Sequence, residues 1–362
     1  MPKVLVAPLD WGLGHATRCI PIIRELVVLG CEVTIAASGQ TEVLLRTEFP
    51  NLRFMQLRGY QIRYGKCGVL FSLLRQLPRI LRTIKYEQKW LAKLLKKEKF
   101  DAIISDNRPG LFHDSIYSVY ITHQLQIQSG IGSLADRLLY GLHKQYYRRF
   151  SEVWVPDFET SPGLAGKLSH PKQHSRNVIY IGPLTRLQKE NASSLKYDLM
   201  ILFSGPEPQR SIFEHEIMEQ LHQYNEKVLL VRGLPGTEPK PTHLPKNIEI
   251  ENHLSAIALS SAIAASSIII CRSGYTTIMD LICLQKKAVL IPTPGQTEQE
   301  YLARHLEEHG VFPYIRQFEF DLKEAINRSR NFSFNHPEYE KQFQNYQKVI
   351  RSWLEKINAM QD

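Results

Sequence analysis

The residue types best suited to hold an anionic ligand follow an apolar run in the second half of the chain. Residues 268–270 are Ile-Ile-Ile and lead into Cys-Arg-Ser-Gly-Tyr-Thr-Thr at 271–277, a pattern that predicts a strand, a tight turn and a helix start. Amides and hydroxyls at a helix start favour a diphosphate, because the positive end of the helix dipole lies there. About one turn further on, a carboxylate at Asp280 would accept from both hydroxyls of a ribose. The candidate binding residues of this segment are Arg272, Ser273, Gly274, Tyr275, Thr276, Thr277 and Asp280.

A polar loop follows the next predicted strand, at residues 288–291. Residues 292–301 are dense in carboxamides and carboxylates, and Gln296, Gln299 and Glu300 carry groups that suit sugar hydroxyls. A solvated surface loop can have the same composition. The position of this loop beside the Ser-Gly turn favours ligand binding, because convergent polar groups mark binding sites.

A glycine-bearing loop with one histidine follows the first predicted strand, at residues 10–18. Glycines such as Gly14 let the backbone approach a ligand, and the helix start that follows favours anionic groups. An NAD site is disfavoured, because Thr17 replaces the third glycine of G-x-G-x-x-G and residues 38–39 are Ser-Gly where an acid is expected. His15 lies at the helix start, where a neutral imidazole can accept a proton. A tight strand-to-helix turn alone would also explain the glycines.

An acidic residue, Asp106, follows the apolar strand predicted at residues 102–105. Its carboxylate would orient His15 and stabilise the imidazolium that forms when this ring accepts a proton. Alternatively, Asp106 caps a turn or pairs with Arg108. The sequence leaves both possibilities open.

A further loop follows the strand predicted at residues 198–203. Ser204 and Gly205 are placed there to hold a phosphate. Pro206 and Pro208 lack N–H groups, which limits the number of amides that can point at an anion.

Strand and helix patterns alternate along both halves of the chain, which predicts parallel sheets covered by helices on both faces. A polar stretch at residues 185–196 is typical of a linker. We therefore predict an α/β protein of two Rossmann-like domains. The first comprises residues 1–188 with a C-terminal helix within 337–362, and the second comprises residues 189–336. Ligands of such sheets bind beyond the carboxyl ends of the strands, where the polar loops are predicted.

The composition excludes several classes of protein. The chain has 362 residues, of which 43% are hydrophobic, so it can form two domains with cores of their own. Five scattered cysteines without a C-x-x-C pair argue against a disulfide framework and a zinc site, and favour a reducing compartment. The N-terminus lacks the apolar stretch of a secretory signal, and the longest uncharged stretch, 254–271, contains five serines. We expect a cytoplasmic protein with no transmembrane segment and no metal site.

The positive charge is concentrated in one segment. The formal net charge of the chain is +9, and residues 58–99 alone contain twelve Lys and Arg against Glu87 and Glu98. A basic amphipathic helix of this kind can lie on an anionic membrane surface, or it can pack on a sheet with its basic face in solvent. A non-catalytic nucleic-acid binder would use the same cations to contact phosphates. That alternative is disfavoured, because it leaves the Ser-Gly turn and the loop at 292–301 unexplained.

At these residues the chain resembles the nucleotide-sugar glycosyltransferases with the GT-B fold, specifically family 28. Cys-Arg-Ser-Gly at 271–274 with Asp280 is similar to that family's C-R-S-G…E donor motif, and Gln-Glu-Tyr at 299–301 is similar to its Q-Q-Y sugar-binding run. Gly-Pro-Leu-Thr-Arg at 182–186 is similar to the interdomain G-N-P-V-R. Gly-Leu-Gly-His at 12–15 lies where the family has G-T-G-G-H. The likeness spans nearly the whole chain in order.

The resemblance implies two facing domains, a nucleotide-sugar donor with UDP as the nucleotide, and neither cofactor nor metal. It implies that Arg186 meets the donor phosphate, and that the backbone around His253 and Leu254 reads the uracil. His15, oriented by Asp106, would deprotonate an acceptor hydroxyl in an inverting displacement. The helix dipole and the arginine would then take the role that a metal plays elsewhere.

Several departures from the family pattern leave the substrates open. Asp280 is one methylene shorter than the family glutamate, and Glu300 replaces a glutamine, so the donor sugar is not determined. The proline-rich loop at 204–208 departs from the family's G-G-S-x-G. The acceptor half matches poorly beyond its first loop, and a lipid-linked acceptor is one candidate among others. A UDP-sugar epimerase of the same fold would share the donor site and is the alternative activity.

Overall fold

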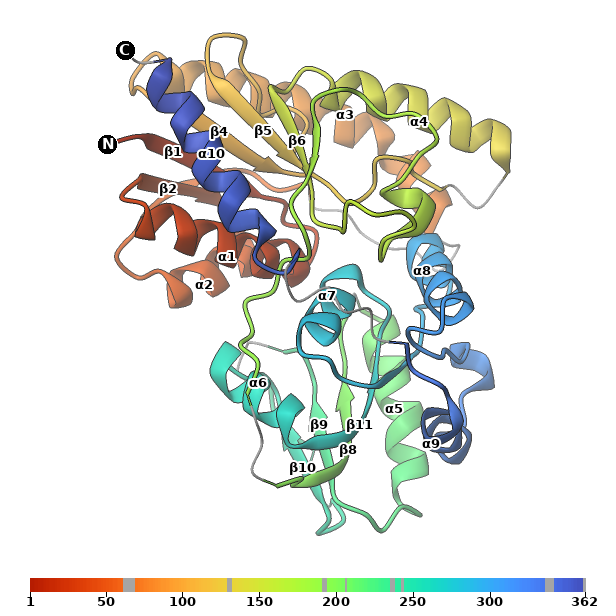
Figure 1. Cartoon of the computed structure of the whole chain (residues 1–362). Helices are drawn as coiled ribbons and strands as arrows, with labels where there is room; N and C mark the ends of the chain where they lie inside the picture. Colours follow the sequence, from red (N-terminus) through yellow and green to blue (C-terminus); the bar gives the residue numbers. More distant parts are fainter. Residues whose placement is uncertain are drawn as a thin grey trace. The chain divides into compact units, whose positions relative to one another are not determined.

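The computed structural model describes residues 1–60, 69–128, 132–190, 194–205, 207–234, 238–241, 244–335 and 342–360. The chain divides into two compact units, Met1–Thr185 with Tyr339–Asp362, and Arg186–Glu338. We call them the N-terminal and the C-terminal domain. Each has a parallel sheet with helices packed on it (Figure 1).

The N-terminal domain has a seven-stranded sheet in the order β3-β2-β1-β4-β5-β6-β7, and the paired strands are parallel throughout. Consecutive strands run outward in one direction from β1 and in the other direction from β4, so the strand order reverses between these two. Buried apolar residues fill the central strands, because helices cover both faces of the sheet. The strands are β1 (Lys3–Pro8), β2 (Glu32–Ala37), β3 (Arg53–Gln56), β4 (Ala102–Asp106), β5 (Tyr117–Ile121), β6 (Glu152–Val155) and β7 (Val178–Tyr180).

Helices cover the two faces of this sheet. On one face α10 packs against α1, where Arg351 contacts Glu25 at 3.3 Å (Figure 1). The C-terminal helix therefore belongs to the N-terminal domain. It begins at Asn345, later than the apolar pattern predicted, and residues 337–341 of that pattern lie outside the described residues. The helices are α1 (Leu13–Val28), α2 (Gly39–Glu48), α3 (Val69–Leu95), α4 (Ser133–Tyr147), the 3₁₀ turn η1 (Gly166–Leu168) and α10 (Asn345–Ala359).

The helix α3 contains much of the basic segment. Its last turns place Leu91 and Leu94 in a core with Leu5 and Ala7 of β1, while the lysines of these turns are exposed. This half of α3 thus packs on the sheet with its basic face in solvent. Residues 61–68 of the basic segment lie outside the described residues, and no described helix is long and apolar enough to cross a bilayer.

The C-terminal domain repeats this plan with a five-stranded parallel sheet in the order β10-β9-β8-β11-β12. The strand order reverses between β8 and β11. The helices α5 and α9 cover one face, where Phe213 and Ile326 join the core formed by Leu199 and Ile201 (Figure 1). The strands are β8 (Tyr197–Leu202), β9 (Val228–Val231), β10 (Ile248–Glu251), β11 (Ser266–Cys271) and β12 (Ala288–Leu290). The helices are α5 (Gln209–Leu221), α6 (Ala256–Ala264), α7 (Tyr275–Cys283), α8 (Thr297–Glu308), the 3₁₀ turn η2 (Gln317–Glu319) and α9 (Leu322–Asn331).

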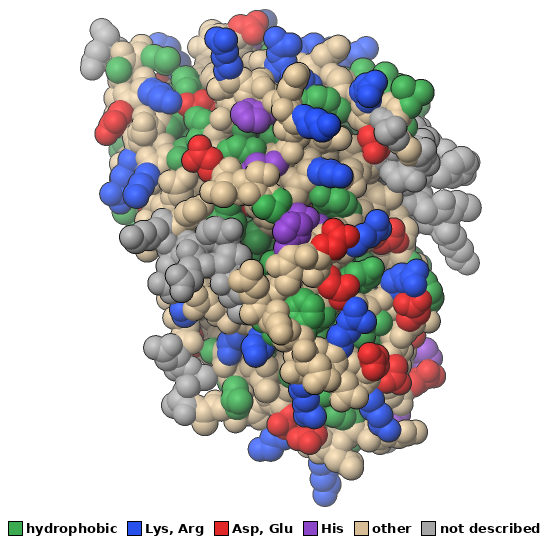
Figure 2. Space-filling model, turned by 45° about the vertical axis from the view of Figure 1, so that its right-hand side comes forward, with side chains coloured by type: hydrophobic (Ala, Val, Ile, Leu, Met, Phe, Trp, Pro, Cys, Tyr) green, Lys and Arg blue, Asp and Glu red, His purple; other side chains and the backbone are tan. Residues whose placement is uncertain are grey.

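Charged side chains of both signs are mixed on the surface. On the face drawn in Figure 2, Lys and Arg lie among Asp and Glu, and hydrophobic side chains are scattered between them.

Candidate active site

Both sheets carry their polar loops where the strand order reverses. In the N-terminal domain, β1 and β4 are neighbours, and the loop containing His15 follows β1 while Asp106 ends β4. In the C-terminal domain, β8 and β11 are neighbours, and they lead into Ser204 and into the Ser-Gly turn at Ser273. Ligands of open α/β sheets bind at such reversals, outside the carboxyl ends of the strands. These two edges are therefore the candidate sites of their domains.

In the N-terminal domain His15 contacts Asp106. The helix α1 begins directly after Gly12, whose φ of +96° suits a glycine, and this turn places His15 in the first turn of the helix. Its Nδ1 lies 2.8 Å from Oδ2 of the fully buried Asp106. An ionised carboxylate only accepts hydrogen bonds, so this contact is a hydrogen bond when Nδ1 carries the proton, and Nε2 then keeps its lone pair. The pairing of Asp106 with Arg108 is wrong, because Arg108 instead contacts Glu87 at 2.8 Å.

An arginine that the sequence did not single out completes this cluster. Arg18 is 2% exposed, and its Nε donates to Asp106 Oδ1 at 3.0 Å while its Nη2 binds the same oxygen. Its Nη1 lies 3.3 Å from Nδ1 of His123, which follows β5. The sequence signal that could have identified Arg18 was its position three residues after His15, because residues three apart on a helix face the same side. Arg18 and His15 therefore both reach Asp106.

Burial and charge set the protonation of this cluster. Burial alone would raise the pKa of the Asp106 carboxyl, but Arg18 and His15 outweigh that effect and lower the pKa below its usual value. Asp106 is thus ionised although it is buried. Burial and the charge of Arg18 lower the pKa of His15 from 6.5, against the opposite effect of Asp106. The imidazole is therefore neutral at pH 7, which is the form that can accept a proton.

In the C-terminal domain α7 begins without a side-chain cap. The N-cap residue is Gly274, which has no side chain to cap the helix, and the first amides of a helix have no acceptor within it. By contrast, Ser255 caps α6 by accepting from Ala258 N, and Asp321 caps α9 by accepting from Glu324 N. Thr276, Thr277 and Asp280 of α7 are half-buried, and Tyr275 is buried.

A buried cation, Arg272, lies in the turn that precedes this helix. Arg272 is 1% exposed, and its guanidinium donates to Ile291 O at 3.2 Å and to Gln317 Oε1 at 2.8 Å. It also lies over the ring of Phe213, with Cζ 4.2 Å from the centroid. Burial lowers the pKa of Arg272 to about 10, against the opposite effect of the Glu216 carboxylate, and the oxygens that accept its hydrogen bonds in the described parts of the chain are neutral. Its side chain thus ties the end of β11 to the residues that follow β12 and to the start of α5.

The polar loop at 292–301 is braced by its own side chains. Gln299 Oε1 accepts from Thr293 N at 2.9 Å, and its Nε2 donates to Gln296 Oε1 at 2.6 Å. Ser273 Oγ donates to the carbonyl oxygen of Gln299 at 2.9 Å, which ties the Ser-Gly turn to this loop. Glu300 is half-buried, and its Oε1 accepts from Gly295 N at 2.9 Å. Both ends of the Gln299 carboxamide are thus engaged within the loop.

The remaining candidates lie at the same edge or at the domain boundary. Gly205 has a φ of +100°, and a Cβ at that position would lie 3.8 Å from Thr293 Oγ1. That hydroxyl is buried and has no hydrogen-bond partner among the described residues, and Pro206 lies outside them. His253 and Leu254 follow β10, Ser204 follows β8, and Gly14 lies in α1 of the N-terminal domain; all four are half-buried. Arg186 is the first residue of the C-terminal domain and is 7% exposed.

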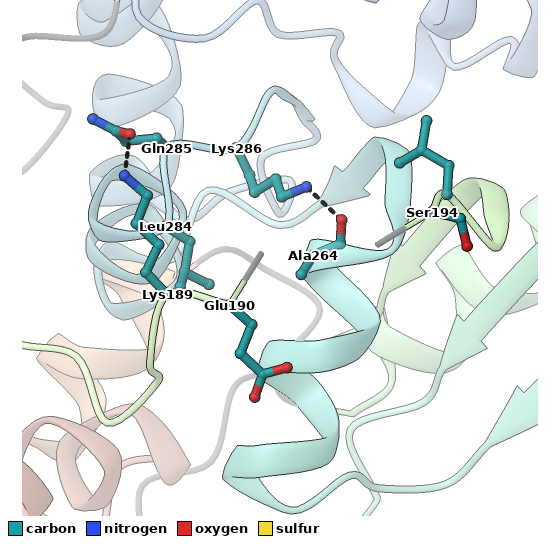
Figure 3. A pocket seen from close by; sticks show the side chains of 8 residues that line it. Lys189, Glu190, Ser194, Ala264, Leu284, Gln285 and Lys286 are labelled. Atoms are coloured by element: carbon teal, nitrogen blue, oxygen red, sulfur yellow. Dashed lines mark hydrogen bonds between the residues drawn. The ribbon is translucent and has the colours of Figure 1, made fainter. Parts of the chain in front are cut away.

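A groove of about 440 Å³ lies at the opposite edge of the C-terminal sheet (Figure 3). Its walls come from residues that precede β8, β11 and β12. Lys286 Nζ donates to the carbonyl oxygen of Ala264, the last residue of α6, at 2.7 Å, and Lys189 Nζ donates to Gln285 Oε1 at 2.6 Å (Figure 3). The C-terminal ends of α6 and α7 disfavour an anion there. We therefore do not assign the ligand site to this groove.

The described residues contain no cluster of three or more His, Cys, Asp or Glu that could hold a metal ion. The cluster around His15 at the carboxyl edge of the N-terminal sheet contains two histidines, a carboxylate and an arginine. This set suits proton transfer.

Comparison with known proteins agrees with the fold and the motifs. Residues 211–353 match the glycosyltransferase family 28 C-terminal domain. An uncharacterized glycosyltransferase of Methanosarcina mazei is 24% identical over 334 residues, which are 85% of this chain and 84% of that protein.

A second relative carries a more specific name. A UDP-N-acetylglucosamine–N-acetylmuramyl-(pentapeptide) pyrophosphoryl-undecaprenol N-acetylglucosamine transferase of Caldanaerobacter subterraneus is 29% identical over 207 residues, which are 52% of this chain and 55% of that protein. The crystal structure of CalG4, the calicheamicin glycosyltransferase, superposes with a TM-score of 0.69 over 99% of this chain and 98% of that one, at 13% identity. The epimerase alternative gains no support from these relatives. The chain is a glycosyltransferase of the GT-B fold, similar to family 28.

Proposed function

We propose that this glycosyltransferase moves a sugar from a UDP-sugar to an acceptor hydroxyl, with inversion and without a metal ion. The observation that carries the donor side is the start of α7. The helix begins at Tyr275 without a side-chain cap, and Arg272, a buried cation that donates to neutral oxygens, lies in the turn that precedes it. Both features favour a bound diphosphate.

The proposed reaction is a single displacement. Nε2 of His15 accepts the proton of the acceptor hydroxyl while its oxygen forms a bond to the anomeric carbon of the sugar. The bond between that carbon and the diphosphate oxygen breaks, and the nucleoside diphosphate leaves with the bonding electrons. Asp106 stabilises the imidazolium, and the α7 amides and Arg186 stabilise the departing charge. One displacement at the anomeric carbon inverts its configuration.

The remaining donor contacts follow from the positions of the side chains. Asp280 would accept from the ribose hydroxyls, and the backbone at residues 253–254 would contact the base. Glu300 and Gln296 would bind the sugar. Because Gln299 is engaged with Thr293 and Gln296, we assign it the role of bracing the sugar-binding loop. The name of the Caldanaerobacter relative includes a UDP-sugar donor, which supports UDP.

Calorimetry with UDP, GDP and dTDP tests the donor proposal. We expect UDP to bind and Asp280→Ala to weaken this binding about tenfold or more, because a hydrogen bond to a charged group contributes about 1.5–3 kcal/mol. Glu324→Ala is the matched control, since Glu324 lies in α9 and the α9 cap involves only its backbone. If none of the three nucleotides bound at millimolar concentration, the donor site would be wrong. Preferred binding of GDP or dTDP would refute UDP alone.

We also propose that the acceptor is lipid-linked and that the N-terminal domain meets an anionic membrane. Leu134, Leu138 and Leu142 lie four residues apart on α4, with exposed fractions of 79%, 67% and 48%. Leu77 and Leu81 of α3 are 47% and 41% exposed, and the arginines between and beside them are exposed. Apolar side chains next to cations suit the boundary between headgroups and acyl chains.

Co-sedimentation with vesicles tests the membrane proposal. We expect binding to vesicles that contain anionic lipid, weakened by salt and by Leu138→Glu. Ile257→Glu is the control, because Ile257 is 77% exposed on α6 of the other domain. Binding that is indifferent to anionic lipid and to Leu138→Glu would refute the membrane contact.

A further inference from the structure

Arg18 lies at the centre of the buried polar cluster around His15. Its three guanidinium nitrogens reach three different residues. Nε and Nη2 bind Asp106 Oδ1, Nη1 lies 3.3 Å from His123 Nδ1, and Nη2 lies 2.7 Å from His15 Nδ1. A guanidinium donates and never accepts, so Nδ1 of His123 is the acceptor in its contact. His123 is 5% exposed, so Arg18 is held by two buried residues, Asp106 and His123.

The contacts of His15 Nδ1 compete with one another. Asp106 Oδ2 lies 2.8 Å from this nitrogen and can only accept, whereas Arg18 Nη2 lies 2.7 Å from it and can only donate. When Nδ1 carries the proton, Asp106 is satisfied and Nε2 is free to accept a proton. When Nδ1 lacks the proton, Arg18 donates to it and Nε2 carries the proton. Arg18 is therefore positioned to influence which ring nitrogen is the base.

The charged and titratable groups near His15 come from four elements. Arg18 and Cys19 lie on α1, Asp106 ends β4, Tyr120 lies on β5, and His123 follows β5. Asp106 is the one carboxylate among these groups, and Arg18 binds both it and the ring. A proton on His15 therefore leaves the cluster with one excess positive charge. An imidazolium formed here is held less tightly than one paired with a carboxylate alone.

We propose that Arg18 is a positioning residue of the transfer reaction, which clamps Asp106 against His15 so that Nε2 of the ring receives the acceptor's proton. This inference rests on the proposed function, in which His15 is the base. Arg18 keeps Asp106 ionised in a fully buried site, and so the carboxylate orients the ring. It also keeps the ring neutral before the reaction and favours release of the proton afterwards.

Nuclear magnetic resonance of ¹⁵N-labelled histidine tests the inference without substrate. In the wild type we expect the Nδ1–H tautomer of His15 and a pKa below 6.5. Arg18→Met removes the cation, so the pKa of His15 rises, whereas Arg18→Lys keeps the charge and leaves the pKa near the wild-type value. Arg24→Met is the matched control, because Arg24 lies on the same helix and pairs with Glu48 at the surface. An unchanged His15 pKa and tautomer in Arg18→Met would overturn the inference.

Kinetics separate positioning from a merely structural role. In Arg18→Met we expect kcat/KM to fall about a hundredfold, which is typical of a misplaced catalytic group. The acidic limb of its pH profile should move to higher pH. Arg18→Lys should recover part of the activity, and its acidic limb should lie at the wild-type pH. If both variants lost activity but the acidic limb of their pH profiles stayed at the wild-type pH, the inference would be overturned, because damage to the fold alone lowers activity without changing the pKa of the base.

The double variant Arg18→Met/Asp106→Asn covers the case in which Arg18→Met does not fold. Removing both buried charges together is tolerated better than leaving one unpaired. Compared with Asp106→Asn alone, the double variant should show a higher pKa of His15, and an equal pKa would count against Arg18. Failure of the proposed function gives a different result. In that case His15→Ala keeps its activity, while Arg18→Met still shifts the His15 pKa.

Discussion

Replacement of Asp106 by asparagine is the sharpest test of the His15–Asp106 pair. The amide keeps the shape of the side chain but removes the charge that Nδ1 of His15 contacts at 2.8 Å and that Arg18 binds. A general base contributes roughly a hundred- to ten-thousandfold to the rate. Loss of about a thousandfold in kcat corresponds to about 4 kcal/mol of transition-state stabilisation. We expect Asp106→Asn and His15→Ala each to fall within this range.

The two residues should act as one unit, and so their effects should not multiply. The double variant His15→Ala/Asp106→Asn should be no slower than His15→Ala alone, because Asp106 has no ring left to orient. Steady-state kinetics of sugar transfer measure all three variants. Asp101→Asn is the matched control, since Asp101 directly precedes β4 at its other end and accepts from the backbone N of Lys3 at 2.6 Å. A double variant slowed by the product of the two single effects would refute the pair.

The same substitution should also destabilise the N-terminal domain. Asparagine leaves the guanidinium of Arg18, which is 2% exposed, without a buried counter-charge. Breaking a buried ion pair by removing one partner costs about 3–5 kcal/mol. For a domain of this size we expect Tm to fall by about 10 °C. A fall in activity without any change in Tm would show that the ion pair between Arg18 and Asp106 does not stabilise the fold as its contacts indicate.

Four further predictions concern pH and the Ser-Gly turn at 271–277. Burial and Arg18 lower the pKa of His15 from 6.5. The acidic limb of the pH profile of kcat/KM should therefore lie below pH 6.5, and a limb above that value would contradict the assignment of His15 as the base. For the same reason the neutral ring stabilises the fold fully above pH 6.5, and denaturant titrations should show this contribution declining as the pH falls below 6.5 towards the folded-state pKa. Arg272→Met leaves the carbonyl oxygen of Ile291 unsatisfied and removes a buried positive charge. Calorimetry should show that this variant binds UDP more than tenfold more weakly. An unchanged affinity would show that Arg272 does not contribute to the proposed UDP site. Ser273→Ala removes the bond to the carbonyl oxygen of Gln299, worth about 1 kcal/mol, and UDP binding should weaken about fivefold; stronger binding would argue against the brace.

Local patterns predicted the segments around the Ser-Gly turn at 271–277. The apolar run, the Ser-Gly turn and the following helix were expected at residues 268–280, and the structure has β11 ending at Cys271 and α7 beginning at Tyr275. The signal is local, because an apolar run, a small-residue turn and a helix start follow one another within about a dozen residues. The C-terminal helix was harder to delimit. Its apolar pattern continued N-terminal to Asn345, where the helix begins.

Contacts between distant residues decided the chemistry of the N-terminal site. His15 and Asp106 are 91 residues apart, and they meet because β1 and β4 are neighbours in the sheet. From the sequence, Asp106 could equally pair with Arg108, which instead contacts Glu87 of α3. Arg18 was missed because an arginine on an amphipathic helix is usually solvated, and only the sheet order shows that it points at a buried carboxylate.

The sequence by itself determined the fold class, the family resemblance and the loops in which the site residues lie, since these depend on local periodicity and short motifs. Only the tertiary structure decided what the side chains contact. Arg272 belongs to the Cys-Arg-Ser-Gly motif, yet its guanidinium lies over the ring of Phe213, and the carboxamide of Gln299 braces its own loop. The physical reason is that hydrogen bonds and ion pairs depend on distances of about 3 Å. Such distances are set by strand order and helix packing, which bring together residues far apart in the chain.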